Sequence, residues 1–148
     1  MTTSTRFVVA THLLTALAVV GGKPMRSEDL AYSANTGAVV VRGLLSRLTA
    51  AGLTTSQLGA GGGALLAKPA EQITLLDIYR AVENTELFAV HRTPPCENCA
   101  VGGNILPALQ PVLQRAQQAM EAQLAAVSVA QLAADVAQLG KFTLPLEQ

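Results

Sequence analysis

Two cysteines and two histidines are the side chains of this sequence best suited to metal or redox chemistry. Cys96 and Cys99 form a C-x-x-C pair inside a segment rich in proline and glycine. His91 precedes that pair, whereas His12 lies near the start of the chain. Because C-x-x-C spacing lowers the thiolate pKa in redox proteins, one interpretation is a reversible disulfide. Cys96, Cys99 and His12 are therefore candidate sensor residues, for oxidants or for a ligand.

Other interpretations of these side chains stay open. A zinc ion would need ligands beyond two thiolates, such as His91 or groups from a second subunit. Glu97 lies between the cysteines, and a carboxylate raises rather than lowers a thiol pKa. The cysteines can also be ordinary small residues near the dimer interface, with Cys99 buried, and His12 can be a core histidine bonded to backbone. The expected state holds no metal and no cofactor.

The composition predicts a helical core in a chain of one-domain size. Half of the 148 residues are hydrophobic, yet aromatic residues make up only 3% and tryptophan is absent. The core must therefore consist mainly of Leu, Val and Ala, which favours helices over a β-sandwich. The first apolar stretch, residues 7–20, is too short and too polar to span a bilayer, and no cleavage site follows it. We expect a cytoplasmic protein with no membrane partner.

Charge is distributed unevenly along a chain whose formal net charge is zero. Residues 1–70 carry six basic and two acidic residues, and residues 71–148 carry four basic and eight acidic ones. Backbone phosphates are contacted mainly by Lys and Arg, so a nucleic-acid surface would lie in the first half. An enzyme is not expected, because the sequence has neither a nucleophile-base-acid set nor a phosphate-binding loop before a helix.

Polar caps and glycines divide the first half of the chain into three helices. The expected ranges are about 5–20, 27–33 and 36–51, and glycines follow the first and the third. The second and third helices, joined by a few residues, form the helix-turn-helix arrangement. The expected capping residues are Ser4 or Thr5, Ser27, and Asn35 or Thr36.

A hairpin is expected directly after the helix-turn-helix. Residues 53–56 and 64–68 are short extended candidates, and the stretch between them is rich in glycine. Glycine makes positive φ accessible without steric cost, so this stretch suits the tip of a hairpin. In that position the hairpin is a wing. Thr74 and Asp77 then form a capping box for a helix that ends near Val82.

The second half of the chain is expected to be a loop and two helices. Residues 86–104 are irregular, a long helix with an apolar face runs from Ile105 to about Val127, and a last helix follows a Ser128 cap and ends at Gly140. The predicted fold is mainly α with a small β-wing. Its parts are a winged helix-turn-helix (1–83), a cysteine-containing loop (84–104) and a C-terminal part with the long helix (105–148).

Several motifs occur together at a specific spacing. They are Asp29-Leu30-Ala31, Leu44-Leu45-Ser46-Arg47-Leu48, Ala51-Gly52-Leu53, Gly59-Ala60-Gly61-Gly62-Gly63, Ile73-Thr74-Leu75-Leu76-Asp77 and Ala81-Val82-Glu83. In these motifs the sequence resembles the Rrf2 family of bacterial winged-helix transcription regulators. The C-terminal half resembles the YwnA-like branch of that family through Leu87-Phe88, His91, Cys99-Ala100-Val101-Gly102, Asn104-Ile105 and Ala119-Met120-Glu121.

The resemblance implies a transcription regulator, expected to be a repressor, that binds a roughly palindromic operator on double-stranded DNA. It also implies a homodimer held by the long helix packed across its mate, with half-sites about one helical turn apart. Iron-sulfur members of the family carry three cysteines in the loop and a further ligand, whereas this sequence has two. A cluster or zinc site would combine Cys96 and Cys99 with a ligand such as His12 or His91, and relatives can supply a ligand at the position of His12 from the other subunit.

Candidate DNA contacts are concentrated at the start of the second helix of the helix-turn-helix, the recognition helix. Arg42 is the main candidate for base reading, since a guanidinium pairs bidentately with guanine, and a phosphate contact is its alternative. Arg47 is expected on phosphate or in support of the fold. Short polar side chains near the helix start can bind phosphate or act as caps. The full set is Arg26, Ser33, Asn35, Thr36, Val39, Val40, Arg42, Gly43, Arg47, Gly59, Gly61 and Gly62.

The wing departs from the family pattern. Many relatives carry an arginine just before the first wing glycine, and this sequence has Leu58 there. A leucine cannot supply the charge that holds a wing in the minor groove. Near-zero net charge and few basic residues in the recognition helix support an alternative function, a protein-interaction module without sequence-specific DNA binding.

Overall fold

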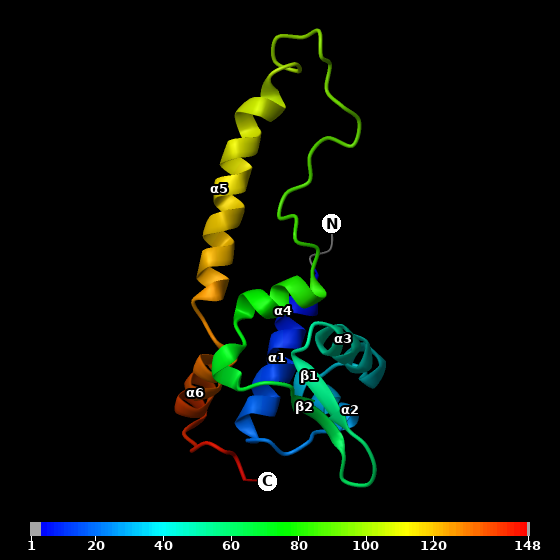
Figure 1. The fold of residues 1–148 in the computed structure, drawn as a ribbon, viewed down its shortest axis with the longest axis vertical. Coiled ribbons are helices and arrows are strands. Elements are labelled where there is room, and N and C mark those ends of the chain that lie inside the picture. The colour runs from blue at the N-terminus through cyan, green and yellow to red at the C-terminus, as the bar shows by residue number, and fades with distance from the viewer. Residues whose placement is uncertain (1–3, 148) are drawn as a thin grey trace.

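The computed structural model describes residues 4–147 and shows a helical body from which a long helix and the loop before it project (Figure 1). No helix in this part of the chain has the length and hydropathy that a membrane crossing requires. The fold is mostly helical with a two-stranded antiparallel sheet, as the sequence predicts. The elements are α1 (Arg6–Val19), α2 (Ser27–Ala34), α3 (Ala38–Ala50), β1 (Thr54–Gln57), β2 (Gly63–Leu66), η1 (Ala70–Gln72), α4 (Leu75–Val82), α5 (Ile105–Ala125) and α6 (Val129–Gly140).

Helix α1 is the centre of the hydrophobic core. It packs against α2, α3, α4 and α6, and its Leu13 and Leu14 are fully buried together with Leu30 of α2, Leu48 of α3 and Ile78 of α4. Burying one such side chain stabilises a fold by about 2 kcal/mol relative to leaving it exposed. Aliphatic side chains thus form the core that the aromatic-poor sequence requires.

The turn between α2 and α3 differs from the prediction. Asn35 adopts a left-handed conformation with φ 50° and ends α2, instead of capping α3. Gly37 is at the N-cap position of α3, and no side chain caps that helix. Arg26, and not Ser27, is at the N-cap position of α2. Asparagine tolerates the left-handed region, so the residue type that can begin one helix also ends another.

The wing is an antiparallel pair of β1 and β2, with Thr54 opposite Leu66 and Gln57 opposite Gly63. Its strands begin and end one or two residues away from the predicted ranges. Backbone hydrogen bonds of 3.1 and 2.8 Å between Met25 and Ala64 tie β2 to the segment before α2. A Cβ atom at Gly63 would clash with the carbonyl oxygen of Met25, so only glycine permits this close approach.

Both helix caps predicted in the second half are present. Thr74 Oγ1 accepts a hydrogen bond from the Asp77 amide at 3.2 Å, and the Asp77 carboxylate accepts one from the Thr74 amide at 2.9 Å. The predicted capping box of α4 is therefore confirmed. At the start of α6, the Ser128 hydroxyl accepts from the Gln131 amide at 3.1 Å.

The segments before α4 and α6 lie side by side. The Leu75 amide donates to the Val127 carbonyl at 3.0 Å, and the Val129 amide donates to the Ile73 carbonyl at 2.8 Å. The chain therefore returns from α5 to the point where α4 begins. We call residues 83–127 the arm and the remaining described residues, 4–82 and 128–147, the body.

The arm consists of an irregular loop and α5, which run beside one another away from the body (Figure 1). Gln117 Nε2 of α5 donates to the Thr85 carbonyl of the loop at 2.7 Å, and α5 packs against α4. None of the arm residues, all of which the structure describes, is buried. The apolar side chains of α5 are at best half-buried: Leu106, Leu109, Leu113, Met120 and Leu124.

Candidate nucleic-acid interface and cysteine loop

Helix α3 turns one face to the body and the other to solvent. Val41 and Leu44 are buried, whereas Val39 is 75% and Val40 is 50% exposed. Gly43 is exposed as well, with open space where a Cβ atom would lie. Exposed apolar residues at the start of such a helix suit contact with thymine methyl groups in the major groove.

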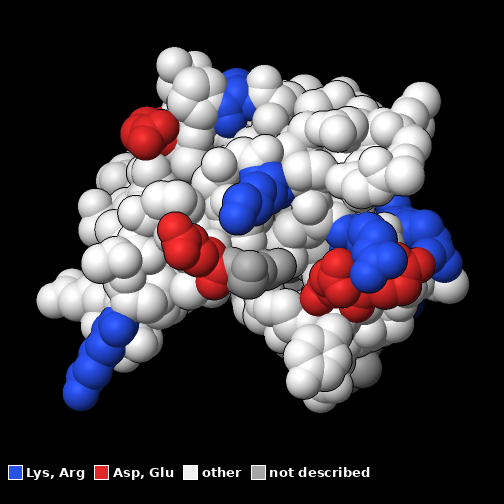
Figure 2. Space-filling view, turned by 90° about the horizontal axis from the view of Figure 1, so that it is seen from below, with Lys and Arg blue, Asp and Glu red and all other residues white. Residues whose placement is uncertain are grey.

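Two of the three arginines of the predicted interface are paired with carboxylates of α2. Arg42 Nη1 lies 3.8 Å from Glu28 Oε1, and Arg26 Nε lies 3.4 Å from Asp29 Oδ2. Seen from the end opposite the arm, basic and acidic side chains are interleaved and form no continuous basic face (Figure 2). Exposed pairs of this kind contribute about 0–1 kcal/mol to stability, so a phosphate or base can displace the carboxylate.

Polar residues of the turn hold helices together. Ser33 Oγ and His12 Nε2 form a hydrogen bond of 2.8 Å that joins α2 to α1. The Thr36 amide donates to the Ala31 carbonyl at 3.0 Å, which closes the turn around Asn35. Ser33 and Asn35 are nevertheless exposed and lie just before α3. They are accessible to a phosphate beside the recognition helix.

Arg47 lies on the far end of α3 and contacts α4. Its Nη1 donates to the Val82 carbonyl, the last of α4, at 3.3 Å. A carbonyl at a helix C-terminus has no partner within the helix, so this contact satisfies one such group. Of the two roles expected for Arg47, support of the fold is the one with an observed contact.

The tip of the wing is built from glycine and carries an exposed leucine. Gly59 and Gly61 have φ values of 91° and 76°, which L side chains rarely adopt. A Cβ atom at Gly62 would clash with the carbonyl oxygen of Gln57. Leu58 is 91% exposed. The glycines therefore shape the tip, and the side chain offered at the tip is apolar.

Tyr32 is a candidate contact that the sequence analysis missed. It is 90% exposed on α2, while its neighbours Leu30 and Ala31 are buried. A phenolic hydroxyl beside the recognition helix can donate to a phosphate oxygen. The helical phase of α2, with Leu30 and Ala31 facing the core, is the signal that places Tyr32 outside.

Cys96 and Cys99 are free thiols, and both are exposed in the single chain. The chain turns tightly here, because the Gly103 amide donates to the Cys99 carbonyl at 2.8 Å. Hydrogen bonds from the backbone amides of Gly102 and Val101 lower the pKa of the Cys99 thiol and outweigh the slight burial that raises it. The loop therefore favours the reactive thiolate form of Cys99.

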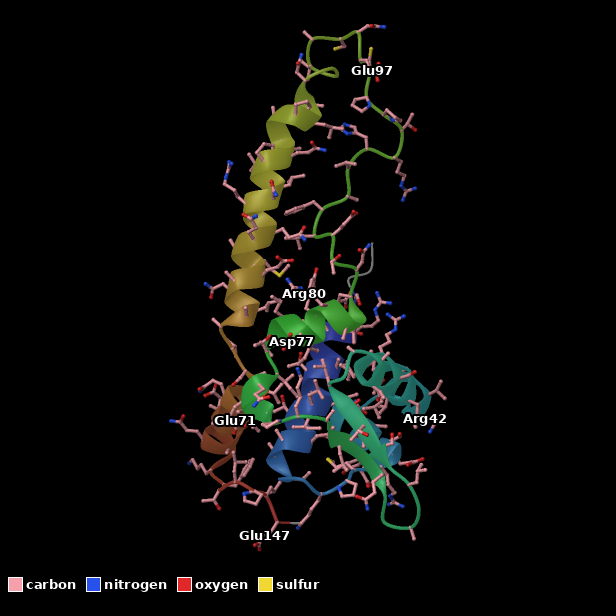
Figure 3. All side chains as sticks on the ribbon, viewed as in Figure 1. Arg42, Glu71, Asp77, Arg80, Glu97 and Glu147 are labelled. Carbon is pink, nitrogen blue, oxygen red and sulfur yellow. The ribbon has the colours of Figure 1, made fainter. Side chains whose placement is uncertain are left out.

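Metal ligands are not gathered in the described residues. Between residues 4 and 147 no three His, Cys, Asp or Glu side chains lie together so that they could hold a metal ion. His12 is on α1 in the body, whereas Glu97, between the cysteines, is at the far end of the arm (Figure 3). Zinc sites with protein ligands need three or four of them, and clusters need four. The metal-ligating side chains of the described residues therefore fit neither a zinc ion nor an iron-sulfur cluster within one chain.

Helices α2 and α3 and the β1–β2 hairpin together define a winged helix-turn-helix protein, a class that binds DNA. A family model described as "Rrf2: Iron-dependent Transcriptional regulator" matches residues 3–135. The chain belongs to the Rrf2 family of DNA-binding transcriptional regulators. Members of this family are regulators, and the chain is not an enzyme. Among residues 4–147 of one chain, no set of side chains matches the iron of the family's description.

Similar proteins support this assignment. YwnA of Bacillus subtilis (strain 168), provisionally described as an HTH-type transcriptional regulator, is 41% identical over 127 residues, which are 85% of this chain and 92% of YwnA. A crystal structure provisionally described as a DNA-binding protein is 37% identical and superposes with a TM-score of 0.68, over 86% of this chain and 97% of that one. CymR (YrzC), the global cysteine regulator of B. subtilis, is 26% identical with a TM-score of 0.71, over 91% and 98% of the two chains.

Proposed function

We propose that the protein represses transcription as a homodimer that binds a roughly palindromic operator and responds to oxidants through Cys96 and Cys99. The observation that supports operator binding is the exposed start of α3 beside the wing, in a family of DNA-binding regulators. Repression is proposed by analogy with the family alone.

In the proposed complex Arg42 leaves Glu28 and pairs with a guanine, while Val39 and Val40 contact thymine methyl groups. Gly43 lets α3 approach the bases closely. The wing glycines follow the minor groove with their backbone. The remaining candidates contact phosphates or support the helices: Arg26, Ser33, Asn35, Thr36 and Arg47.

Fluorescence anisotropy with the protein's own promoter region, in competition with unrelated DNA, tests this assignment. Arg42→Ala is expected to reduce the preference for the promoter about 5- to 150-fold and to leave the oligomeric state unchanged. Arg92→Ala in the arm removes the same charge away from α3 and serves as the control. Unchanged promoter preference in Arg42→Ala would show that α3 does not read bases through this residue.

The proposed dimer uses α5. An apolar helix face that is only partly covered in one chain gains stability when a second copy covers it. Leu109→Glu is expected to raise the dimer dissociation constant at least about tenfold, because a charge would be buried in the interface. Leu139→Glu, on the solvent side of α6, is the matched control in sedimentation equilibrium. Equal dimerisation of the two variants would rule out this face.

The proposed response to oxidants is a thiol-disulfide step with a peroxide. The Cys99 thiolate attacks one peroxide oxygen and forms a sulfenic acid as the O–O bond breaks, and the departing hydroxide takes up the proton that the thiol had released and leaves as water. The Cys96 thiol then displaces the second water and forms the disulfide. In total, two thiols and one hydrogen peroxide give one disulfide and two waters.

Mass spectrometry and thiol titration after hydrogen peroxide treatment test this step. Wild-type protein should lose both thiols and two hydrogens and change its promoter affinity. Cys96→Ser should stop at the sulfenic acid of Cys99, whereas Cys99→Ser should react far more slowly. A chain that keeps both thiols at millimolar peroxide would contradict the proposal.

The second candidate function is a protein-interaction module. The ion pairs of Arg42 with Glu28 and of Arg26 with Asp29, and the exposed Leu58, favour it. Removing the carboxylate of Glu28 distinguishes DNA binding from the interaction module. Glu28→Gln should strengthen promoter binding severalfold at low salt if Arg42 contacts DNA, and DNA affinity should fall steeply with added salt. No effect of either change would favour the interaction module.

A further inference from the structure

A hollow of about 260 Å³ lies beside the base of the wing. It is enclosed by the last turn of α1, the chain that follows α1, the strand β2 and η1, which meet in the body (Figure 1). Among the described residues, none of the candidate DNA contacts or sensor residues lines the hollow, and α5 of the proposed dimer does not reach it. The hollow is therefore distinct from the candidate sites described above.

The floor of the hollow is apolar. Leu17 of α1 is buried there, and Leu65 and Leu66 of β2 are half-buried. The volume of about 260 Å³ lies below the roughly 300–1,000 Å³ of sites for drug-sized ligands, so the hollow suits a molecule of a few carbon atoms. The aliphatic part of such a molecule would remove leucine surface from water.

Two lysines at the hollow are available for an anion. Lys23, from the chain after α1, and Lys68, from the chain after β2, both line it and are both exposed. Arg26 and Arg42 of the candidate DNA interface are paired with carboxylates, whereas neither lysine forms an ion pair within residues 4–147. An ammonium group carries three donors on a flexible stem, so both lysines can turn toward one bound anion.

The third charged residue that lines the hollow is Glu71. Like the two lysines, it forms no ion pair in the described part of the chain. The three side chains leave the hollow with one net positive charge, which one negative charge complements. A nearby carboxylate repels a dianion, or the continuous charge of a nucleic acid, more strongly than a monoanion. The charge pattern thus favours a monocarboxylate over a phosphate.

We infer that this hollow binds a small monocarboxylate with a short aliphatic part. The carboxylate lies between Lys23 and Lys68, and the aliphatic part covers Leu17 and the leucines of β2. Each of the three parts of the hollow then has a role: the lysines attract the anion, the floor selects for an aliphatic group, and Glu71 selects against a second negative charge.

A molecule bound there would contact both sides of the joint that fixes the wing. Lys23 is two residues before Met25, and Met25 forms the backbone hydrogen bonds of 2.8 and 3.1 Å with Ala64 of β2. The leucines of the floor follow Ala64 directly. The ligand therefore restrains the wing relative to the helix-turn-helix. This effect on DNA binding, though not the binding site, rests on the proposed function.

The test uses the full chain and 3-methylbutanoate as the probe, in a titration followed by nuclear magnetic resonance. The backbone amide signals of Lys23 and Lys68 should shift saturably. Lys23→Gln and Lys68→Gln should each weaken binding at least about fivefold, because each removes one charged donor. Lys141→Gln removes the same charge outside the hollow and should leave the affinity unchanged. Glu71→Gln should tighten binding of the probe and allow inorganic phosphate to compete with it.

Two further probes separate the charge from the aliphatic part. Acetate lacks most of the aliphatic part, and 3-methylbutan-1-ol lacks the charge, so each should bind at least about fivefold more weakly than 3-methylbutanoate. Equal binding of acetate and 3-methylbutanoate, equal affinities in the three lysine variants, or shifts that do not saturate would overturn the site. Tighter binding of phosphate than of 3-methylbutanoate to the wild type would overturn the monocarboxylate as its ligand.

Promoter binding is then measured with and without 3-methylbutanoate at a concentration that saturates the wild type. The probe should change the DNA affinity of the wild type at least about threefold, and this change should be lost in the double variant Lys23→Gln/Lys68→Gln. Bound probe with unchanged DNA affinity would overturn the effect on the wing. If the chain does not bind the promoter but the probe still saturates the hollow, the proposed function fails and the site stands.

Discussion

Buried side chains are concentrated in the body, where α1, α2, α3, α4 and α6 share one core, whereas every residue of the arm is exposed or half-buried. The body therefore has its own source of stability. The arm is held by α4, by a few hydrogen bonds and, in the proposed dimer, by a second copy. The comparison shows that one short chain can combine a body with its own hydrophobic core and an arm without any buried residue, which a second copy would cover in the proposed dimer.

The largest expected effect distinguishes the stability of the two regions. Leu13→Ala, at a fully buried position, should lower the free energy of unfolding by about 3 kcal/mol at every protein concentration, because it leaves a cavity in the core. Leu109→Ala in the arm should lower it only at concentrations where the protein is dimeric. Urea unfolding at several protein concentrations measures both. If the two variants lost equal free energy of unfolding in the monomer, the arm would have a stabilising partner within its own chain. The contrast between body and arm would then be wrong.

A medium effect is expected where the body meets the arm. Thr74→Ala removes the side chain that caps α4 and should cost about 1 kcal/mol of unfolding free energy. Thr93→Ala, in the exposed loop of the arm, should change nothing measurable. Thermal or urea unfolding of the two variants gives the result. A loss at Thr93 as large as that at Thr74 would place stabilising structure in the loop.

The smallest effect concerns Glu83, the first residue of the arm. Burial raises its pKa, but hydrogen bonds from Ser4 and the Phe7 amide and the charge of Arg6 outweigh this and hold the pKa below the usual 4.5. A carboxylate with a lowered pKa stabilises the fold above its unfolded pKa, and that contribution is lost as the pH falls through the folded value.

Unfolding measured from pH 6 to pH 3 should therefore show a steeper loss of stability below pH 4.5 in the wild type than in Glu83→Gln. The difference should be about 0.5 kcal/mol, because the charge pair is partly exposed. Arg6→Gln should remove part of the same difference. Parallel pH profiles for wild type and Glu83→Gln would show that the arm is not anchored to α1 by this carboxylate.

Local signals of the sequence predicted most of the body. The glycines after α1, the Thr74 capping box and the glycine-rich wing each have one dominant structural meaning, and each occurs as expected. Asn35, one of the two residues expected to cap α3, ends α2 instead, because its side chain suits both a helix start and a left-handed helix end. Element boundaries at residues with a single structural meaning were thus predictable. A boundary at a residue that suits both the start and the end of a helix was not.

The candidate site was predictable only as a set of positions. The sequence places Arg42 and Glu28 on different helices, and their pairing depends on how α2 packs on α3. Likewise, Glu97 beside the cysteines predicts a raised thiol pKa, but hydrogen bonds from the backbone amides of Gly102 and Val101 lower the pKa of Cys99. Interactions that depend on tertiary packing or on loop geometry leave no signature in residue spacing.

The paired segments at the starts of α4 and α6 have an evolutionary consequence. The arm leaves the body after the last turn of α4 and returns beside the first, where the Val129 amide meets the Ile73 carbonyl. Its entry and exit points are therefore both fixed by α4, and the core closes without it. The arm can therefore be exchanged, lengthened or given another cysteine pattern in evolution while the winged helix-turn-helix of the body stays the same.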